Sequence, residues 1–446
     1  MPRRALAALA ASVLGIAGCA GAPRPLNVVL VLVDTLRADH LGLYGYARPT
    51  SPALDAFAED AAVFTDARSQ AGCTFPSVNS LLTSQLPERF LGQPDDAIGI
   101  PEGMATLPEL LRARGWTTAA VSASSVVRRR PSEHNPRGGF GRGFDLFLEA
   151  CEWKAAGCVN RQALPLLRSL RRPFFLYLHY LDPHAPYRPP RAHPRRFAHG
   201  WSDKRFIRRG DPNPIGRALY RGAPDPGISA ADLRLLIDHY DEEIAYWDGE
   251  LARLLETLAA AGLDDDTIVV VASDHGEEFL EHGHIKHCRT VFDSSIRVPL
   301  LLRAPGVAPA RIAVGAQNLD VLPTLLDLLG LPAAGHTFAG RSLRPALESG
   351  DRLHRRQVSA QGAFHAVVGP RHKLIVDLAG GGAWLYDLAA DPGETRDRLA
   401  VERRAAAPLR AALGEWLAAG PDGGTAGLLA RSREAEERLR AVGYID

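Results

Sequence analysis

Six polar side chains in this 446-residue sequence are of types that bind a metal ion and react with an anionic group. Two carboxylates, an imidazole and a hydroxyl suit one divalent ion of borderline-to-hard preference, such as Zn²⁺, Mn²⁺ or Ca²⁺. Two further imidazoles can bind the oxygens of a tetrahedral anion or protonate a leaving group. The predicted metal ligands are Asp34, Thr74, Asp274 and His275, and the predicted catalytic residues are Thr74, His184 and His287.

Thr74 is the predicted nucleophile because of the stretch around it. Residues 71–83 (AGCTFPSVNSLLT) form a small hydroxyl-rich turn followed by an apolar run with a proline near its start, which predicts a helix N-terminus. A hydroxyl there lies near the positive end of the helix dipole, where an anion binds and a nucleophile is activated. A metal ion beside the hydroxyl would lower its pKa. Helix capping alone is the commoner role of such a hydroxyl.

Each histidine is a weaker signal by itself. The chain has 15 histidines, and His282, His284 and His287 crowd one segment. A structural or surface role is commoner for any one of them than a role in binding. The prediction for His184 and His287 therefore depends on the rest of the set.

The candidate residues follow predicted buried strands. Residues 27–33 (NVVLVLV) and 267–273 (TIVVVAS) are continuous β-branched, apolar runs, which indicate strands buried on both faces of a helix-covered parallel sheet. Asp34 directly follows the first run, and Asp274 and His275 follow the second. Because ligand groups collect at the carboxyl ends of parallel strands, both ends are predicted to meet at one site.

The remaining pattern predicts an α/β protein. Residues 174–179 indicate another strand, and residues 230–260 a long amphipathic helix. From about Gln357, short strands alternate with turns, and the last forty or so residues are helical and amphipathic. We therefore predict a three-layer α/β/α sandwich with a mostly parallel central sheet, and a small C-terminal antiparallel α+β subdomain.

Residues 189–227 interrupt this pattern with many Pro, Arg and Gly residues. We expect a long irregular insertion, because loops of this length in compact domains are usually functional or disordered. Its arginines would suit an anionic ligand, although a solvated basic loop is the commoner outcome.

The N-terminus predicts export. Two arginines precede an apolar run at residues 5–14, and Ile16-Ala17-Gly18-Cys19 resembles a bacterial lipobox. We expect a signal peptide over residues 1–18, lipid attachment at Cys19 as the membrane contact, a tether over 19–25 and a cell-envelope location. An ordinary secretory signal is the alternative. With 52 basic and 51 acidic residues, nothing global indicates a nucleic-acid partner.

Export would permit disulfides among the four remaining cysteines, which are Cys73, Cys151, Cys158 and Cys288. Cys151 and Cys158 are close enough to close a small loop, and the other two each lie beside a candidate site residue. Three pairings exist, and the sequence does not choose among them.

Seven motifs together resemble the sulfatase family of the alkaline phosphatase superfamily. They appear in family order between about residues 26 and 400. They are residues 27–45 (NVVLVLVDTLRADHLGLYG), 48–55 (RPTSPALD), 74–77 (TFPS), 178–187 (LHYLDPHAPY), 273–277 (SDHGE), 297–300 (RVPL) and 386–394 (YDLAADPGE).

The resemblance implies a catalytic domain over residues 26–350, followed by a C-terminal subdomain with terminal helices over 351–446. It also implies one metal site and a covalent enzyme–anion intermediate. By position in the motifs, Asp34, Asp274 and His275 are similar to metal ligands, Thr74 to the nucleophile, and His184 and His287 to substrate-anion ligands.

Four positions differ from the family pattern. Sulfatases carry Cys or Ser where Thr74 stands, oxidise it to formylglycine, and have Arg where Val78 stands. Threonine cannot form that aldehyde, because its Cβ is branched. The second acid after the first strand is replaced by Thr35. His275 stands where the calcium-dependent arylsulfatases have Asn after the aspartate. With this Asp-His pair, the site looks more like the metal-dependent phosphotransferases and phosphodiesterases of the superfamily, whose nucleophile is often Thr.

We expect a metal-dependent hydrolase or transferase that acts on a phosphate or sulfate ester through Thr74. A catalytically inactive lipoprotein that uses the fold as a binding module is one alternative, because a fold does not guarantee its usual activity. A phosphoethanolamine- or glycerophosphate-type transferase is another. The sequence specifies neither the substrate nor the oligomeric state.

Overall fold

The computed structural model describes residues 25–89, 99–132, 135, 138–153, 155–333, 335–349 and 356–418. The predicted signal peptide, the predicted lipidation site Cys19 and residues 419–446 lie outside these ranges, so the expectations about them stay predictions. None of the helices in the described ranges combines the length and apolar character that a bilayer crossing requires.

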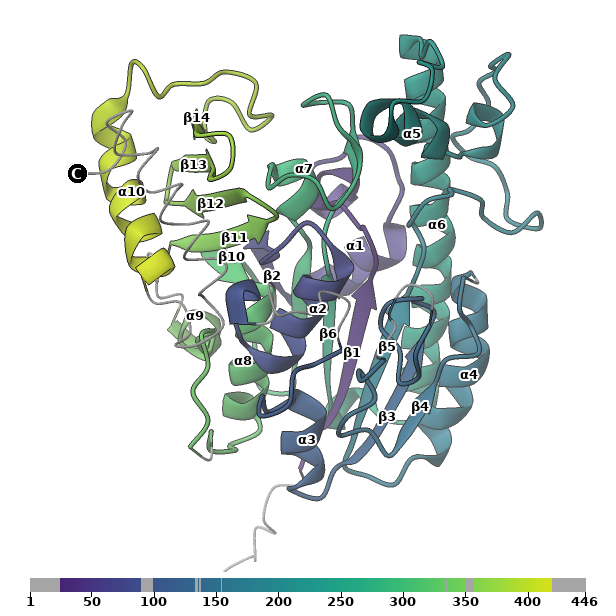
Figure 1. Ribbon diagram of the computed structural model, residues 1–446. Coiled ribbons are helices and arrows are strands. Elements are labelled where there is room, and N and C mark those ends of the chain that lie inside the picture. Colours follow the sequence, from purple (N-terminus) through teal and green to yellow (C-terminus); the bar gives the residue numbers. More distant parts are fainter. Residues whose placement is uncertain are drawn as a thin grey trace, which may run out of the picture.

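The centre of the fold is an eight-stranded sheet with the strand order β10-β2-β9-β6-β1-β5-β3-β4 (Figure 1). Strand β9 runs antiparallel to both neighbours, and the other pairs of this sheet are parallel. The strands are β1 (Asn27–Val33), β2 (Ala62–Arg68), β3 (Thr117–Ser122), β4 (Leu146–Leu148), β5 (Phe174–Tyr180), β6 (Thr267–Ser273), β9 (Leu300–Arg303) and β10 (Ala310–Gln317).

Helices cover both faces of this sheet. Alternate residues of β1 point into two separate cores, with Val29 and Val31 in one and Val28 and Leu30 in the other. This two-sided burial explains why β1 is apolar at nearly every position. The first core is covered by α1 (Pro52–Glu59), α4 (Ala156–Ser169) and α6 (Ala230–Ala260), and the second by α2 (Thr74–Thr83), α3 (Leu107–Arg112), α8 (Val321–Leu328) and α9 (Arg344–Ser349).

A second, antiparallel sheet follows near the C-terminus, in the order β11-β12-β13-β14 (Figure 1). Apolar residues of α10 pack on it and form a small core of their own. These elements are β11 (Gln357–Gln361), β12 (Phe364–Val368), β13 (His372–Asp377), β14 (Gly382–Asp387) and α10 (Arg403–Ala418). The predicted fold class is therefore confirmed in both of its parts.

The insertion at residues 189–227 is more ordered than we expected. It contains a 3₁₀ turn at Ile207–Arg209 and the helix α5 (Asn213–Arg221). Pro214 lies in the first turn of α5, where a missing N–H costs nothing. The prediction of a long irregular insertion was therefore wrong for these two helical segments.

Candidate active site

The carboxyl ends of β1 and β6 meet at one edge of the sheet. The two strands pair in parallel with Val33 opposite Ser273, so Asp34 and Asp274 emerge side by side. Thr74 comes from a third element, the first residue of α2. The structure thus brings Asp34, Thr74, Asp274 and His275 together, as the sequence predicts.

The His275 imidazole lies close to each of the other three side chains. The Thr74 Oγ1 atom lies 3.1 Å from His275 Nε2, which lies 3.5 Å from Asp274 Oδ2 and 3.8 Å from Asp34 Oδ1. Ligand atoms of the two aspartates and His275 all lie within 4.8 Å of one another. All four residues are buried. This spacing fits a single ion.

The hydrogen bonds leave ligand atoms free to face such an ion. His275 Nδ1 contacts the Gly276 carbonyl at 2.9 Å, and since a carbonyl only accepts, Nδ1 carries the proton and Nε2 presents a lone pair. Asp274 Oδ1 accepts from the backbone N–H groups of Thr35 and His275. Asp274 Oδ2 and Asp34 Oδ1 are buried without a hydrogen-bond partner. Such oxygens are costly unless a cation compensates them, so the donor set fits a divalent metal ion.

The pKa shifts of the buried carboxyl groups also indicate a site for a cation. Burial raises the pKa of Asp34 well above its ordinary value, and the neighbouring Asp274 and Glu277 carboxylates raise it further. Burial likewise raises the pKa of Glu277. A local excess of negative charge in a buried place is a signature of a functional site.

The two predicted substrate histidines lie on the same site. The ring centroid of His287 is 4.9 Å from that of His184 and 4.7 Å from that of His275. Burial lowers the pKa of His184 to about 3 and that of His287 well below its ordinary value. Both rings are therefore neutral at neutral pH, and they interact with an anion through hydrogen bonds rather than through full positive charge. His287 Nδ1 shares a 2.9 Å hydrogen bond with Glu277 Oε1, which orients the ring.

Sequence reasoning missed two nearby groups. His179, near the end of β5, has its Nε2 atom 3.4 Å from Asp34 Oδ2, and its Nδ1 atom is 2.9 Å from the Tyr177 hydroxyl. Lys286 precedes His287, and its ammonium donates to the Asn213 side chain. The signal for His179 was available, because it stands opposite Leu32 of β1 and so close to the same sheet edge.

Two disulfides form, Cys73–Cys288 and Cys151–Cys158. The first joins the residue before Thr74 to the residue after His287, across 215 residues of sequence. A backbone hydrogen bond of 2.7 Å from Cys288 N to Gly72 O reinforces this junction. The nucleophile's helix and the His287 segment are therefore fixed to each other covalently.

Two of the positions that differ from the family pattern carry no charge here. Val78 is fully buried in the core beneath α2. Thr35 has a φ of 57°, and its backbone N–H binds Asp274. Neither position supplies the arginine or the second acid of the pattern, so the site depends on histidines and on the ion it would bind.

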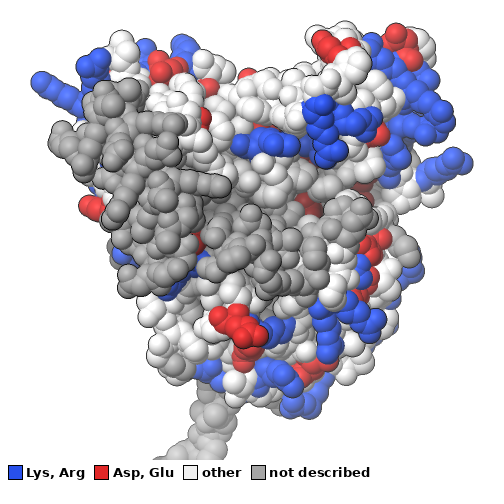
Figure 2. Space-filling model, in the orientation of Figure 1, with Lys and Arg blue, Asp and Glu red and all other residues white. Residues whose placement is uncertain are grey.

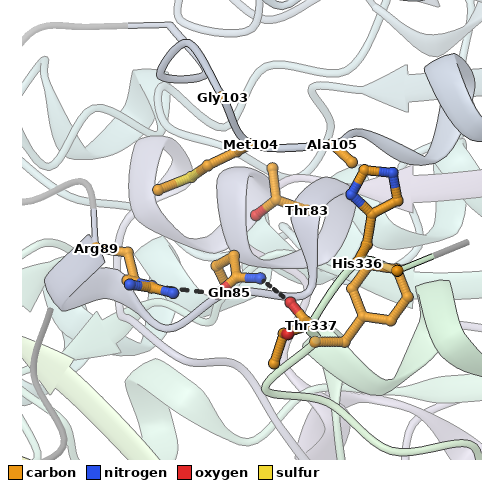
Figure 3. Close-up of a pocket in the computed structure, with 10 residues that line it drawn as sticks. Thr83, Gln85, Arg89, Gly103, Met104, Ala105, His336 and Thr337 are labelled. Carbon is orange, nitrogen blue, oxygen red and sulfur yellow. Dashed lines mark hydrogen bonds between the residues drawn. The ribbon is translucent and has the colours of Figure 1, made fainter. Parts of the chain in front are cut away.

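A separate hollow lies at the far end of α2. It has a volume of about 340 Å³ and is lined by residues that include Thr83, Gln85 and His336 (Figure 3). Gln85 donates to the Thr337 carbonyl and accepts from Arg89. None of the six predicted site residues lines it, so it is distinct from the Thr74 cluster.

Comparison with known proteins agrees with the fold and shows the family. A family model described as Sulfatase matches residues 26–331. Choline-sulfatase of Rhizobium meliloti (strain 1021) is 26% identical over 433 residues, covering 82% of this chain and 81% of that protein. Human arylsulfatase A is 27% identical over 410 residues, covering 78% and 71%.

Among solved structures, a phosphonate monoester hydrolase of Agrobacterium radiobacter has a TM-score of 0.68 and 22% identity, covering 92% of this chain and 96% of that one. This likeness agrees with the fold assigned above. Since the family model spans most of the chain, the chain belongs to the sulfatase family of hydrolases.

Proposed function

We propose that this protein is a metal-dependent hydrolase that cleaves a sulfate or phosphate ester with Thr74 as the nucleophile. The observation that supports this most is the contact of 3.1 Å between Thr74 Oγ1 and His275 Nε2, beside two unpartnered aspartate oxygens. Family membership supports ester hydrolysis, and the cluster supports the particular residues.

Asp34, Asp274, His275 and Thr74 would hold one divalent ion, with Zn²⁺, Mn²⁺ and Ca²⁺ as the candidates. When bound, the ion supplies positive charge that stabilises a deprotonated hydroxyl and the oxygens of the substrate anion. His275 keeps its Nε2 lone pair available for this role because Gly276 holds the proton on Nδ1.

The residues divide the reaction into two steps. As Thr74 Oγ1 forms a bond to the sulfur or phosphorus atom, its proton passes to a neutral histidine, His184 or His287, and the bond to the ester oxygen breaks. The same histidine passes that proton to the leaving oxygen, which departs as an alcohol, and the ring is neutral again. Water then attacks the same central atom, releases the inorganic anion and returns the proton to Thr74.

The choice between sulfate and phosphate follows from the nucleophile. Thr74 cannot become formylglycine, so the hydrated-aldehyde route of sulfatases is closed to it. An ordinary threonine ester must be broken by water at the central atom, which favours phosphoryl chemistry. A transferase, in which a second alcohol replaces the water, uses the same residues.

An inactive binding module is the less favoured alternative. Each buried carboxylate oxygen without a partner destabilises the folded protein. A protein that binds no metal ion and has no activity would have no need for such oxygens. Here the His275 Nε2 atom lies within 3.8 Å of Thr74, Asp34 and Asp274.

The test is turnover of p-nitrophenyl sulfate, p-nitrophenyl phosphate and bis-p-nitrophenyl phosphate with each candidate metal ion, in wild type and Thr74→Ala. The proposal expects at least one substrate to be turned over by wild type and not by the variant. Equal turnover in both would remove Thr74 from the mechanism, and no turnover of any ester under any metal would favour the binding module.

A further inference from the structure

The imidazole of His179 is fully buried at the edge of the Thr74 site, but it is none of the predicted ligands. It lies near the end of β5, opposite Leu32 of β1 in the parallel register. Tyr177 lies two residues before it, and side chains two apart on a strand share a face. Tyr177 belongs to the core beneath α2, the helix that begins with Thr74. The strand therefore carries a tyrosine and a histidine side by side next to this site.

Asp34 is the acid that His179 approaches. His179 Nε2 lies 3.4 Å from Asp34 Oδ2, and within the described residues no other carboxylate pairs with this imidazole. The distance is slightly longer than an ordinary N–H···O hydrogen bond. Elsewhere in the described structure Nε2 completes no hydrogen bond, and a buried N–H without an acceptor is costly. Asp34 Oδ2 is therefore the acceptor that an Nε2–H group would use.

The other nitrogen of the ring shows which one carries the proton. The Tyr177 hydroxyl lies 2.9 Å from His179 Nδ1, and it makes no other hydrogen bond with the described residues. If the hydroxyl donates to Nδ1, the imidazole proton is on Nε2 and both protons face acceptors. If Nδ1 donated instead, the hydroxyl proton would be buried without an acceptor and an Nε2 lone pair would face a carboxylate. The first arrangement is the stable one, and a protonated ring would donate from Nε2 as well.

The two aspartates of the site are then held in the same way. Asp274 Oδ1 accepts from the backbone N–H groups of Thr35 and His275, at 3.1 and 2.8 Å, and Asp34 Oδ2 faces the N–H of His179. The other oxygen of each carboxylate has no partner among the described residues. These two free oxygens lie 3.5 and 3.8 Å from His275 Nε2. Each carboxylate thus has one oxygen beside N–H donors and one facing the place where an ion would bind.

Burial makes a single donor effective here. Figure 2 shows Lys, Arg, Asp and Glu side chains scattered over the visible surface, where water and salt screen their charges. The Asp34 and His179 residues are only 1% and 0% exposed. A hydrogen bond in such a place is electrostatically stronger than one in water. The orientation of the Asp34 carboxylate therefore depends on His179 rather than on solvent.

We propose that Tyr177 and His179 are positioning residues that act on the metal ion through Asp34. Tyr177 holds the imidazole with its Nε2–H toward Asp34 Oδ2, and this N–H holds the carboxylate with Oδ1 turned toward the ion. A ligand that is already oriented loses less freedom when the ion binds, and donors behind metal ligands raise metal affinity. The inference rests on the metal site of the proposed function, but not on Thr74 as the nucleophile.

The test is the affinity of the metal-free full chain for Zn²⁺, Mn²⁺ and Ca²⁺, measured one ion at a time by calorimetric titration. His179→Leu removes the donor, whereas His179→Gln keeps an N–H group near the place of Nε2. Tyr177→Phe removes only the hydroxyl. Tyr180→Phe is its matched control, because Tyr180 is a fully buried residue of the same strand whose hydroxyl donates to Asn160 at 2.6 Å, within the core on the other face of the sheet.

We expect His179→Leu to bind its preferred ion about 10–100-fold more weakly than wild type. His179→Gln should stay within several-fold of wild type because it keeps the donor. Tyr177→Phe should show a smaller, several-fold loss, since the imidazole can then place its proton on either nitrogen. Tyr180→Phe should bind as wild type does, although both phenylalanine variants lose a buried hydroxyl and should melt at similarly reduced temperatures.

Circular dichroism and the melting temperature of the metal-free protein show whether each variant folds. If His179→Leu does not fold, the comparison of Tyr177→Phe with Tyr180→Phe decides, because both variants keep the aromatic ring. The titration requires no turnover. A failure of Thr74 as the nucleophile would therefore leave this measurement and its interpretation unchanged.

Four results would overturn the proposal. Wild-type affinity in both His179→Leu and Tyr177→Phe would remove the pair from metal binding and leave the proposed function intact. Equal weakening in Tyr177→Phe and Tyr180→Phe would show that only packing matters. Affinity in His179→Gln as low as in His179→Leu would mean that the imidazole nitrogen itself binds the ion. Binding of none of the three ions by wild type would overturn this proposal together with the metal site of the proposed function.

Discussion

Two clusters of buried carboxylates in this molecule differ in how their negative charge is compensated. In one, Asp293 of α7 (Asp293–Ile296) accepts hydrogen bonds from Arg68 and Lys373, and Lys373 also pairs with Glu394 at 2.7 Å. In the other, the Thr74 site, Asp34 and Asp274 each keep an oxygen with no partner. Arg68 and Lys373 supply the cations of the first cluster, whereas in the described part of the chain no Arg or Lys forms an ion pair with Asp34 or Asp274.

The pKa directions of Asp293 and Asp34 are opposite, although burial also raises the pKa of Glu394 in the first cluster. Beside Arg68 and Lys373, the pKa of Asp293 lies well below its ordinary value despite burial, whereas the pKa of Asp34 lies well above. A buried acid with internal cations joins parts of a fold, here β2 and β13. A buried acid without them is suited to a cation from outside.

The largest expected effect comes from removing the nucleophile. Thr74→Ala should lower kcat by about 10⁴-fold or more, which corresponds to about 5.5 kcal/mol in the activation free energy. Thr74→Ser should retain measurable turnover because it keeps the hydroxyl. Steady-state kinetics on the best ester substrate measure both, and a Thr74→Ala enzyme within tenfold of wild type would contradict the assignment.

The internally paired cluster should matter for stability instead. Lys373→Met leaves Asp293 and Glu394 partly unpaired in a buried place, which should reduce the free energy of unfolding by about 3–5 kcal/mol. Metal affinity should not change. Denaturant unfolding measures the first quantity and calorimetric titration the second, with the partly exposed Arg344→Met as the control. If Lys373→Met lost metal affinity and kept its stability, the result would contradict the assignment of this cluster to stability and of the Thr74 site to metal binding.

The two disulfides offer a matched comparison. Removing Cys73–Cys288 by double serine substitution should cost about 5 kcal/mol by loop-closure entropy, against about 2.5 kcal/mol for Cys151–Cys158, because the first closes a far longer loop. The first change should also lower kcat, since it frees the His287 segment from Thr74. Similar kinetics in both variants, measured where both are folded, would show that the first bridge does not position the site.

The smallest effect is a pH dependence of the metal-free protein. A carboxyl with a raised folded pKa stabilises the fold below its ordinary pKa near 3.8, and this contribution is lost as pH rises through the raised value. Metal-free Asp34→Asn should escape this loss, so its melting temperature should exceed that of metal-free wild type at neutral pH. The reverse order would mean that Asp34 is stabilised by partners within the protein.

Sequence reasoning predicted the features that depend on continuous patterns. The largely apolar runs of β1 and β6 predicted two strands buried in a parallel sheet, with Asp34 and Asp274 at its edge. Strands β2 and β10 were missed, because β2 carries polar residues within its span and β10 is a partly exposed edge strand. Short mixed segments of this kind become strands only through pairing with distant partners, which periodicity does not report.

The sequence indicated that the six candidate residues lie together, but it did not indicate their protonation states. Asp34, Thr74, Asp274, His275, His184 and His287 all converge, as the motif order indicates. That both substrate histidines are neutral, and that Cys73 pairs with Cys288, depend on burial and three-dimensional distance. Neither quantity can be obtained from residue spacing.

Metal content tests the central claim most directly. Wild type, Asp34→Asn and Asp387→Asn would each be dialysed against Zn²⁺, Mn²⁺ or Ca²⁺ and analysed for bound metal. Asp387 is the control because it belongs to a second His–Asp–Glu group whose acids are already paired with arginines. We predict one ion per chain in wild type and in Asp387→Asn, and far less in Asp34→Asn. Equal metal content in wild type and Asp34→Asn, or none in wild type with any of the three ions, would contradict the account.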